Sequence, residues 1–350
     1  AVEELKTKPT QHSVGKLREI GIDPDIIICR TEKDLSRSIK DKIALFCNVD
    51  EKAVIEEKDV GPFIYQVPLL LKEQGLDDLI LSLIKISSRK NDIAQWKKML
   101  LKARTITDTV IIAITGKYTQ VKDAYKSIHE ALVHGGLANN RMVKIKYVDV
   151  QSDALEKELE EVDGILIPGG FGDRGIEGKI KVVNIARTNN IPFLGICLGM
   201  QCAVIEFARL VCGMNKANST EFAPQTPYPV IDLLAEQRKI KNKGGTMRLG
   251  AYDCKLKKGS LAWRAYRKPL VRERHRHRFE LNNKYRKKFQ DAGLVVTGEY
   301  EKKHLAEIVE LKNHPWFVAV QFHPEFKSRP NRPHPLFVDF IKAAVKRNKK

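Results

Sequence analysis

One cysteine of this sequence stands where a nucleophile could be presented. Cys197 lies between two glycines in "GICLGMQ" (residues 195–201), directly after the apolar run at residues 191–194. A nucleophile flanked by glycines between a strand and a helix is the pattern of a nucleophile elbow, whose small neighbours tolerate a strained backbone. The positive end of the following helix would favour the thiolate. A buried core thiol gives the same pattern, so this stretch alone leaves both interpretations open.

A second stretch, "QFHPEF" at residues 321–326, could supply a base for that cysteine. His323 follows the apolar residues 317–320, which we expect to form a strand, and sites in α/β sheets form at the carboxyl ends of strands. Glu325 can approach the imidazole from behind, hold its tautomer and stabilise the imidazolium. Together, Cys197, His323 and Glu325 predict a nucleophile, a base and a residue that orients the base.

The glycines of "PGGFG" (residues 168–172) could complete this set of groups. Consecutive glycines at the end of a strand leave backbone N–H groups free to face a developing oxyanion. The candidates are the N–H groups of Gly169 and Gly170, together with that of Leu198, which follows the cysteine. A tight turn would need the same glycines, so both interpretations stand.

Two nucleotide-binding patterns are present only in part. Residues 170–175 match GxGxxG after a strand, but the dinucleotide fingerprint also requires an acidic residue at the end of the next strand, where residues 195–199 hold the cysteine instead. Around Gly178 and Lys179 the spacing from Gly172 is one residue too long for a P-loop, and Ile180 replaces the Ser or Thr that would reach magnesium. The sequence therefore disfavours NAD binding and contains no Walker A motif.

Alternating strands and helices would position the candidate residues. From residue 107 to residue 350 this alternation predicts a doubly wound α/β domain. Its expected elements are a strand and turn at 109–118, a helix at 123–136 that ends at its glycines, a strand at 142–150, a strand leading into the turn at 164–172, a helix at 180–190, a strand, turn and helix at 191–211, a β-rich stretch at 249–297, a last strand at 316–326 and a helix at 336–345.

The preceding residues read as a separate, partial α/β domain. Residues 1–86 contain two strand-like runs, 25–30 and 42–49, and a helical segment at 67–84. Residues 87–106 begin as a polar connector and continue as an amphipathic helix, which we interpret as a linker that docks. No internal repeat is found.

Composition narrows the class of protein. With 350 residues, 43% hydrophobic and 30% charged, the chain can bury a sizeable core. No apolar run is long enough for a membrane span and no signal peptide is recognisable. Six cysteines without a CxxC pair favour reduced thiols, no metal site and the cytoplasm. The formal charge of +19 raises nucleic-acid binding through "RERHRHR" (residues 272–278) as an alternative, which the 7% of aromatic residues disfavours.

The quoted motifs, in this order and spacing, resemble class I glutamine amidotransferase domains, and the surrounding sequence resembles the CTP synthase family. The segments that carry this second resemblance include "ANSTEF" (217–222), "GGTMRLG" (244–250), "RHRHRFE" (274–280) and, within residues 1–86, "KTKPTQHSV" (6–14). The resemblance implies a flavodoxin-like doubly wound sheet, preceded by part of a P-loop-type amidoligase domain. It also implies an ATP-dependent amination of UTP to CTP with ammonia from glutamine.

The resemblance assigns roles to individual residues. Cys197 would attack the glutamine carboxamide, His323 would move the proton to the departing ammonia and Glu325 would orient His323. The implied binding residues are Gly170 and Leu198 for the oxyanion; Gly169, Gly170, Phe171, Gln201, Glu221 and the backbone around Arg276 for glutamine; Lys6, Lys8, Gln11 and Lys42 for UTP or CTP; and Arg174, Thr246, Met247 and Arg248 for GTP, the allosteric activator.

In that family the P-loop and the magnesium-binding acids precede the point at which this sequence begins. We therefore expect a fragment that binds no cofactor in its glutaminase domain, with ATP and Mg²⁺ needed only alongside the absent region. Such a chain would hydrolyse glutamine at best and would not make CTP alone. The resemblance implies a homotetramer, with neither nucleic acid nor membrane as a partner. Another class I glutaminase and a catalytically silent scaffold of the same fold are the alternatives.

Overall fold

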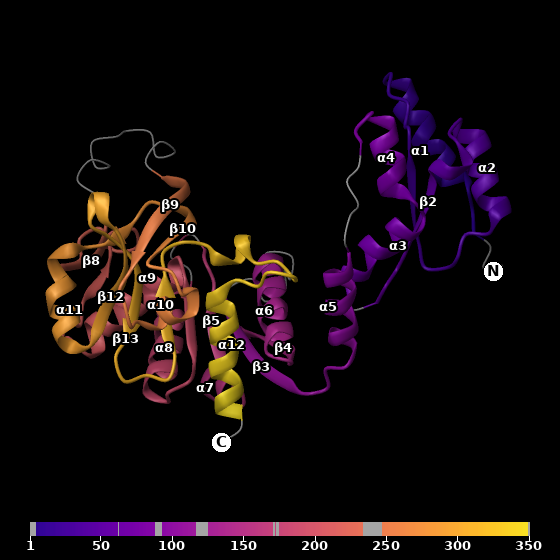
Figure 1. Cartoon of the computed structure of the whole chain (residues 1–350). Helices are drawn as coiled ribbons and strands as arrows, with labels where there is room; N and C mark the ends of the chain where they lie inside the picture. The colour runs from indigo at the N-terminus through magenta and orange to yellow at the C-terminus, as the bar shows by residue number, and fades with distance from the viewer. Residues whose placement is uncertain are drawn as a thin grey trace. The chain divides into compact units, whose positions relative to one another are not determined.

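The chain folds into two compact units, Ala1–Arg104 and Thr105–Lys350 (Figure 1). The computed structural model describes residues 5–61, 63–87, 93–116, 125–170, 172, 175–233 and 247–348. No helix among these residues is long and apolar enough to cross a membrane.

The first unit is a small α/β arrangement around two parallel strands. Strand β1 (Ile27–Thr31) pairs with β2 (Val54–Lys58). The buried side chains come from the strands and from two helices that pack together, and they include Val14, Ile27, Ile43 and Val54. The helices are α1 (Lys8–Glu19), α2 (Arg37–Cys47), α3 (Val67–Glu73), α4 (Leu76–Leu83) and α5 (Ala94–Arg104).

The strand predicted at residues 42–49 is wrong, because residues 42–47 belong to helix α2 and the helix ends there. The buried side chains of this helix, Ile43, Ala44 and Cys47, recur at helical spacing, whereas Leu45 and Phe46 are exposed. A short apolar run fits a buried strand and one face of a helix equally well. Here the helical spacing decides, and the helix ends where Asn48 adopts a left-handed conformation (φ 51°).

The second unit is built on a nine-stranded sheet in the order β10-β9-β12-β13-β14-β6-β5-β3-β4. Five neighbouring strands, β14, β6, β5, β3 and β4, are parallel, and the remaining pairs are antiparallel. The parallel part confirms the doubly wound fold class. The strands are β3 (Thr109–Gly116), β4 (Met142–Asp149), β5 (Gly164–Ile167), β6 (Phe193–Ile196), β9 (Arg248–Leu256), β10 (Leu270–His277), β12 (Leu294–Tyr300), β13 (Leu305–Leu311) and β14 (Phe317–Val320).

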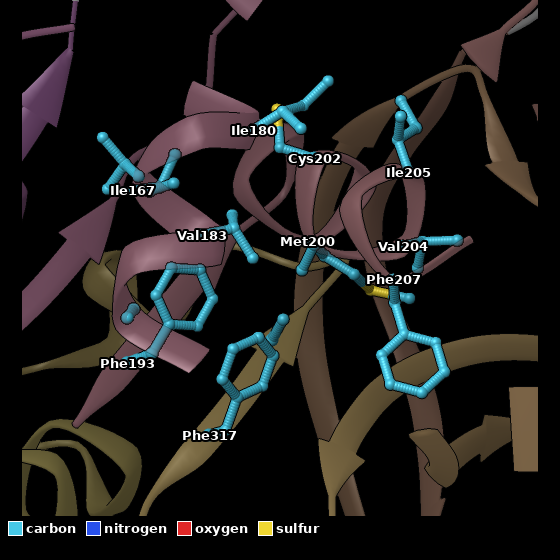
Figure 2. Packing of buried hydrophobic residues seen from close by; sticks show 14 of the residues in the cluster. Ile167, Ile180, Val183, Phe193, Met200, Cys202, Val204, Ile205, Phe207 and Phe317 are labelled. Carbon is cyan, nitrogen blue, oxygen red and sulfur yellow. The ribbon is translucent and has the colours of Figure 1, made fainter. Parts of the chain in front are cut away.

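The two faces of the sheet are covered by different helices. One face contributes Ile165, Phe193 and Phe317 to a core shared with α8 (Ile176–Thr188) and α9 (Leu198–Leu210). Figure 2 shows Phe193 and Phe317 side by side, and their ring centroids are 4.5 Å apart. The alternate strand residues face a second core with α6 (Lys126–Ala138) and α12 (Pro335–Asn348). The period of two along each strand therefore separates the cores.

Two details of the second unit differ from expectation. Helix α6 does not end at its glycines but continues to Ala138. A Cβ on Gly135 would lie 2.8 Å from the carbonyl oxygen of Phe337, and one on Gly136 would lie 2.6 Å from that of Arg141, so these glycines permit close packing. The β-rich stretch also contains two short helices, α10 (Leu261–Tyr266) and α11 (Arg286–Ala292). A small separate sheet joins β11 (Glu280–Leu281), β8 (Tyr228–Asp232) and β7 (Ala217–Ser219).

Candidate active site

The sequence-predicted catalytic residues follow three adjacent strands. In the sheet, β6 lies between β14 and β5. Cys197 comes directly after β6, His323 follows β14, and the glycine pair follows β5. Because the three strands are parallel, their carboxyl ends meet at one edge of the sheet. The fold thus gathers groups that lie more than a hundred residues apart in the sequence.

The turn at Cys197 has the strained backbone expected of a nucleophile elbow. Cys197 has φ 51° and ψ −99°, and helix α9 begins at the next residue. Its N–H donates to the carbonyl oxygen of Val320 at 2.7 Å. A Cβ on Gly199 would lie 2.4 Å from the carbonyl oxygen of Ile167, and one on Gly195 would lie 2.9 Å from the backbone of Gly199. Only glycine on both sides allows strand and helix to cross this closely, which holds the cysteine in its conformation.

His323 and Glu325 form a close, buried pair. Nδ1 of His323 lies 2.8 Å from Oε1 of Glu325, and the two side chains are 13% and 5% exposed. Burial by itself lowers the pKa of His323, but hydrogen bonds to Cys197 and Glu325 and the charges of those groups outweigh it and raise the pKa to about 10. The geometry favours an imidazolium held between the sulfur and the carboxylate. Gln321, which the sequence reasoning missed, also donates to the sulfur, from Nε2 at 3.7 Å.

The glycine pair lies against the same point. A Cβ on Gly169 would be 2.8 Å from Cε1 of His323 and 3.5 Å from Cβ of Cys197. Gly170 approaches Leu198, the first residue of α9. The absence of side chains therefore lets the backbone come close to both the Cys197 side chain and the imidazole.

A pocket of about 290 Å³ opens onto Cys197. Burial raises the pKa of the Glu221 carboxyl in its wall, and the positive charge of Arg278 acts in the opposite direction. A carboxylate and a guanidinium in one small pocket suit a ligand that carries both an ammonium and a carboxylate group. The lining residues are Gly170, Cys197, Gln201, Glu221, Met247, Arg276, His277, Arg278 and Phe279.

Of these lining residues, sequence reasoning missed His277, Arg278 and Phe279. Strand β10 alternates between exposed and buried residues until it ends at His277. Arg278 comes after the strand, so it does not follow the alternation of exposed and buried residues. Its side chain is half-buried in the pocket wall. The end of the arginine and histidine alternation at "RFE" was the signal that could have identified it.

Phe171, Arg174 and Thr246 lie outside the described residues. In the first unit, Lys8 begins helix α1 and Gln11 follows on the same helix, where it donates to Thr7 at 3.1 Å. Lys42 lies on α2, which packs against α1. Lys6, Lys8 and Lys42 are exposed.

Arg248, expected at the GTP site, is held inside the second unit. Its guanidinium donates to Glu280 at 3.0 Å and to Glu307 at 2.9 Å, and the side chain is 8% exposed. It also lies over the ring of Tyr252, 4.5 Å from the centroid. The structure therefore places this arginine in a buried charge cluster, whereas its neighbour Met247 lines the pocket.

The comparisons with known proteins agree with this architecture. Residues 120–343 match the family model described as "Glutamine amidotransferase class-I", and residues 1–86 match "CTP synthase N-terminus". A solved structure of the Trypanosoma brucei CTPS glutaminase domain with bound acivicin superimposes with a TM-score of 0.64 and 40% identity, covering 68% of this chain and 94% of that one. The chain belongs to the CTP synthase family.

The CTP synthase relatives are longer than this chain. The enzyme named CTP synthase from Pelotomaculum thermopropionicum is 56% identical over 349 residues, which is 99% of this chain and 65% of that protein. The one from Aquifex aeolicus is 54% identical over 352 residues, 100% of this chain and 66% of that protein. The chain thus spans about 65% of the length of the curated relatives it matches.

Proposed function

We propose that the second unit hydrolyses the side-chain amide of L-glutamine to glutamate and ammonia. The observation that carries this proposal is the meeting of Cys197, on its strained turn, with the His323–Glu325 pair beside a small charged pocket. In this scheme the Cys197 thiolate attacks the carboxamide carbon. The resulting oxyanion is stabilised by the N–H groups of Gly170 and Leu198.

Proton transfer in this scheme belongs to His323. Its imidazolium gives a proton to the departing amine, so that ammonia leaves and a glutamyl thioester remains on the sulfur. The neutral imidazole then takes a proton from water, which attacks the thioester and releases glutamate. Glu325 keeps the imidazole in one orientation and stabilises its charged form throughout.

The pocket wall supplies complementary charges for the amino-acid end of glutamine. We assign the α-ammonium to Glu221 and the α-carboxylate to Arg278, which lie in the same pocket. Gln201 is held by its Nε2 donating to the carbonyl oxygen of Phe279 at 3.3 Å, and so its amide oxygen can face the ligand. Gly169, Phe171 and the backbone at Arg276 remain further proposed contacts.

For the whole protein we propose the ATP-dependent amination of UTP to CTP, which is consistent with its relatives' name, CTP synthase. Lys6, Lys8, Gln11 and Lys42 would hold the triphosphate of UTP or CTP, since lysines serve as point charges for phosphate. ATP and Mg²⁺ would be used with the further length that the relatives possess. We further propose that GTP activates the enzyme by binding near Met247. We also propose that the whole protein forms a homotetramer and is located in the cytoplasm.

Mass spectrometry of the intact chain tests the glutaminase proposal. The glutamine-analogue alkylator 6-diazo-5-oxo-L-norleucine should add one equivalent to the chain and none to Cys197→Ala. The matched control is Cys212→Ala, a half-buried thiol outside the pocket that should label normally. Labelling that persists in Cys197→Ala would refute the proposal. Ammonia release from glutamine, measured with and without GTP, then separates an active glutaminase from a silent scaffold.

A further inference from the structure

A second, larger cavity lies at the opposite edge of the sheet from Cys197. Its volume is about 1000 Å³, at the upper end of the range for small-molecule sites. Pro192 and Trp316 in its wall directly precede β6 and β14, whereas Cys197 and His323 follow the same strands. Four strand residues separate the two edges, or about 13 Å. The cavity is lined by Asn190, Pro192, Leu261, Trp263, Arg264, Arg267, His314, Pro315, Trp316, Asp339, Lys342, Ala343, Lys346 and Arg347.

Two helices that pack against each other give this cavity its positive charge. On α12 (Figure 1, yellow), Lys342 and Lys346 follow Asp339 at spacings of three and seven, on the face opposite to its buried Phe340. Arg264 on α10 and Arg267 just after it complete the group. Among the described residues, none of these four cations has an ion-pair partner within 4 Å. Four cations outnumber the one carboxylate of the cavity, Asp339, so an anion bound there would reduce their mutual repulsion.

The four cations converge on one place, as their effect on the single carboxylate of the cavity shows. Burial raises the pKa of Asp339, and the charges of Lys342, Arg267, Arg264 and Lys346 all act on it in the opposite direction. Charges that reach the same carboxylate can reach the same ligand. Arg347, which donates to the carbonyl oxygen of Asn189 at 3.3 Å, is a fifth cation that lines the cavity.

Two tryptophans line the wall of the cavity. Trp316 is 4% exposed, so only a small part of its ring is open to the cavity. Trp263, half-buried on α10, adds an aromatic surface beside it.

We propose that this cavity binds a nucleoside triphosphate or a similar phosphate ester with a planar ring. The four cations around Asp339 would hold the phosphates, and Trp263 would contact the ring. This site is separate from the pocket at Cys197, so its occupancy does not depend on glutamine hydrolysis.

Tryptophan fluorescence tests this binding site directly. The chain has three tryptophans, and Trp96→Phe leaves only the two in the cavity wall. In that background, ATP titrated in EDTA should change the emission saturably, and adenosine should not. Lys342→Ser with Lys346→Ser, on the solvent side of α12, should weaken ATP binding at least tenfold. The matched control, Lys284→Ser with Lys302→Ser, removes the same charge from exposed positions outside the cavity and should bind ATP normally.

Three results would overturn the proposal. The first is ATP binding that Lys342→Ser with Lys346→Ser leaves unchanged, or that the control variant weakens equally. The second is that tripolyphosphate binds as tightly as ATP, which would show that the site does not recognise a planar ring. The third is a random oligonucleotide that binds more tightly than ATP through the same lysines with a steep salt dependence, which would assign the surface to nucleic acid.

Discussion

Replacing Glu325 by Gln tests the reasoning about the candidate catalytic residues. The substitution keeps the size of the side chain and removes the charge that lies 2.8 Å from Nδ1 of His323. Both side chains are buried, so water cannot replace the lost interaction. A hydrogen bond to a charged group contributes about 1.5–3 kcal/mol, which corresponds to lowering the pKa of His323 by about 1 to 2. The same free energy predicts a roughly 10- to 100-fold lower kcat for glutamine hydrolysis.

The pH dependence of stability and of kcat shows in which direction the pKa of His323 changes. Because folding raises the pKa of His323 from its ordinary 6.5 to about 10, its imidazolium stabilises the folded state fully below pH 6.5 and ceases to do so as the pH rises through about 10. In Glu325→Gln this loss should begin at lower pH. The basic limb of the kcat profile, which reports loss of the imidazolium, should move down with it.

The assay is ammonia release from glutamine between pH 6 and pH 11, with thermal unfolding followed over the same range. KM should change little, because Glu325 is not among the residues that line the pocket. Glu299→Gln is the control for kcat, since Glu299 lies outside the pocket, 3.1 Å from Nδ1 of the exposed His304. Because this substitution also removes the ion pair with Arg286, it is compared for kcat and its pH profile and not for stability. A Glu325→Gln enzyme with the kcat and basic limb of the unchanged chain would refute the reasoning.

Three further predictions concern the structure around the site. Arg248→Met leaves two carboxylates, Glu280 and Glu307, buried without their cation and should lower the free energy of unfolding by about 3–5 kcal/mol in urea titrations; an unchanged midpoint would contradict this. Gly199→Ala drives a methyl group into the carbonyl oxygen of Ile167, so it should cost about 1–3 kcal/mol. It should also slow alkylation of Cys197, whereas Gly15→Ala should not, because a Cβ at Gly15 meets no atom within 4 Å and the residue lies in helix α1 without a positive φ. Arg278→Met should raise KM for glutamine at least tenfold with kcat within about threefold, by steady-state kinetics; an equal fall in kcat would contradict a role in ground-state binding.

The sequence could predict the candidate site to the extent that its parts are local. The elbow needs only an apolar strand, a cysteine between glycines and a helix, and all of these lie within residues 191–211. The spacing of His323 and Glu325 is likewise local. What brings the two segments together is the strand order β14-β6-β5, which is a property of the whole sheet. The alternation of strands and helices was sufficient for the fold class, since few sheet topologies satisfy it.

The misses come from places where tertiary packing decides. Residues 42–47 are helical because one side of that run packs onto β1 and β2, and a short apolar run does not reveal how many sides are covered. Gly135 and Gly136 were interpreted as the end of a helix, but they are needed for close packing. Gly135 approaches Phe337, which is far away in the sequence, and Gly136 approaches Arg141, which follows the end of the helix. The proposed role of Arg278 depends on Glu221, which lies in the same pocket but 57 residues earlier in the sequence.

The run "RERHRHR" shows how the fold accounts for charge that suggested a nucleic-acid partner. On β10 its residues alternate, with Glu273, His275 and His277 buried and the intervening arginines exposed. The buried members bind within the unit; His277, for example, lies 2.8 Å from Glu280. The exposed arginines lie on a strand at the edge of the sheet, where charged side chains oppose pairing with another chain. The members of the run on β10 therefore have structural roles on both faces of the strand, and the end of the run, from Arg276 to Arg278, also lines the pocket at Cys197. The unpaired cations around Asp339 are better placed to attract an anion.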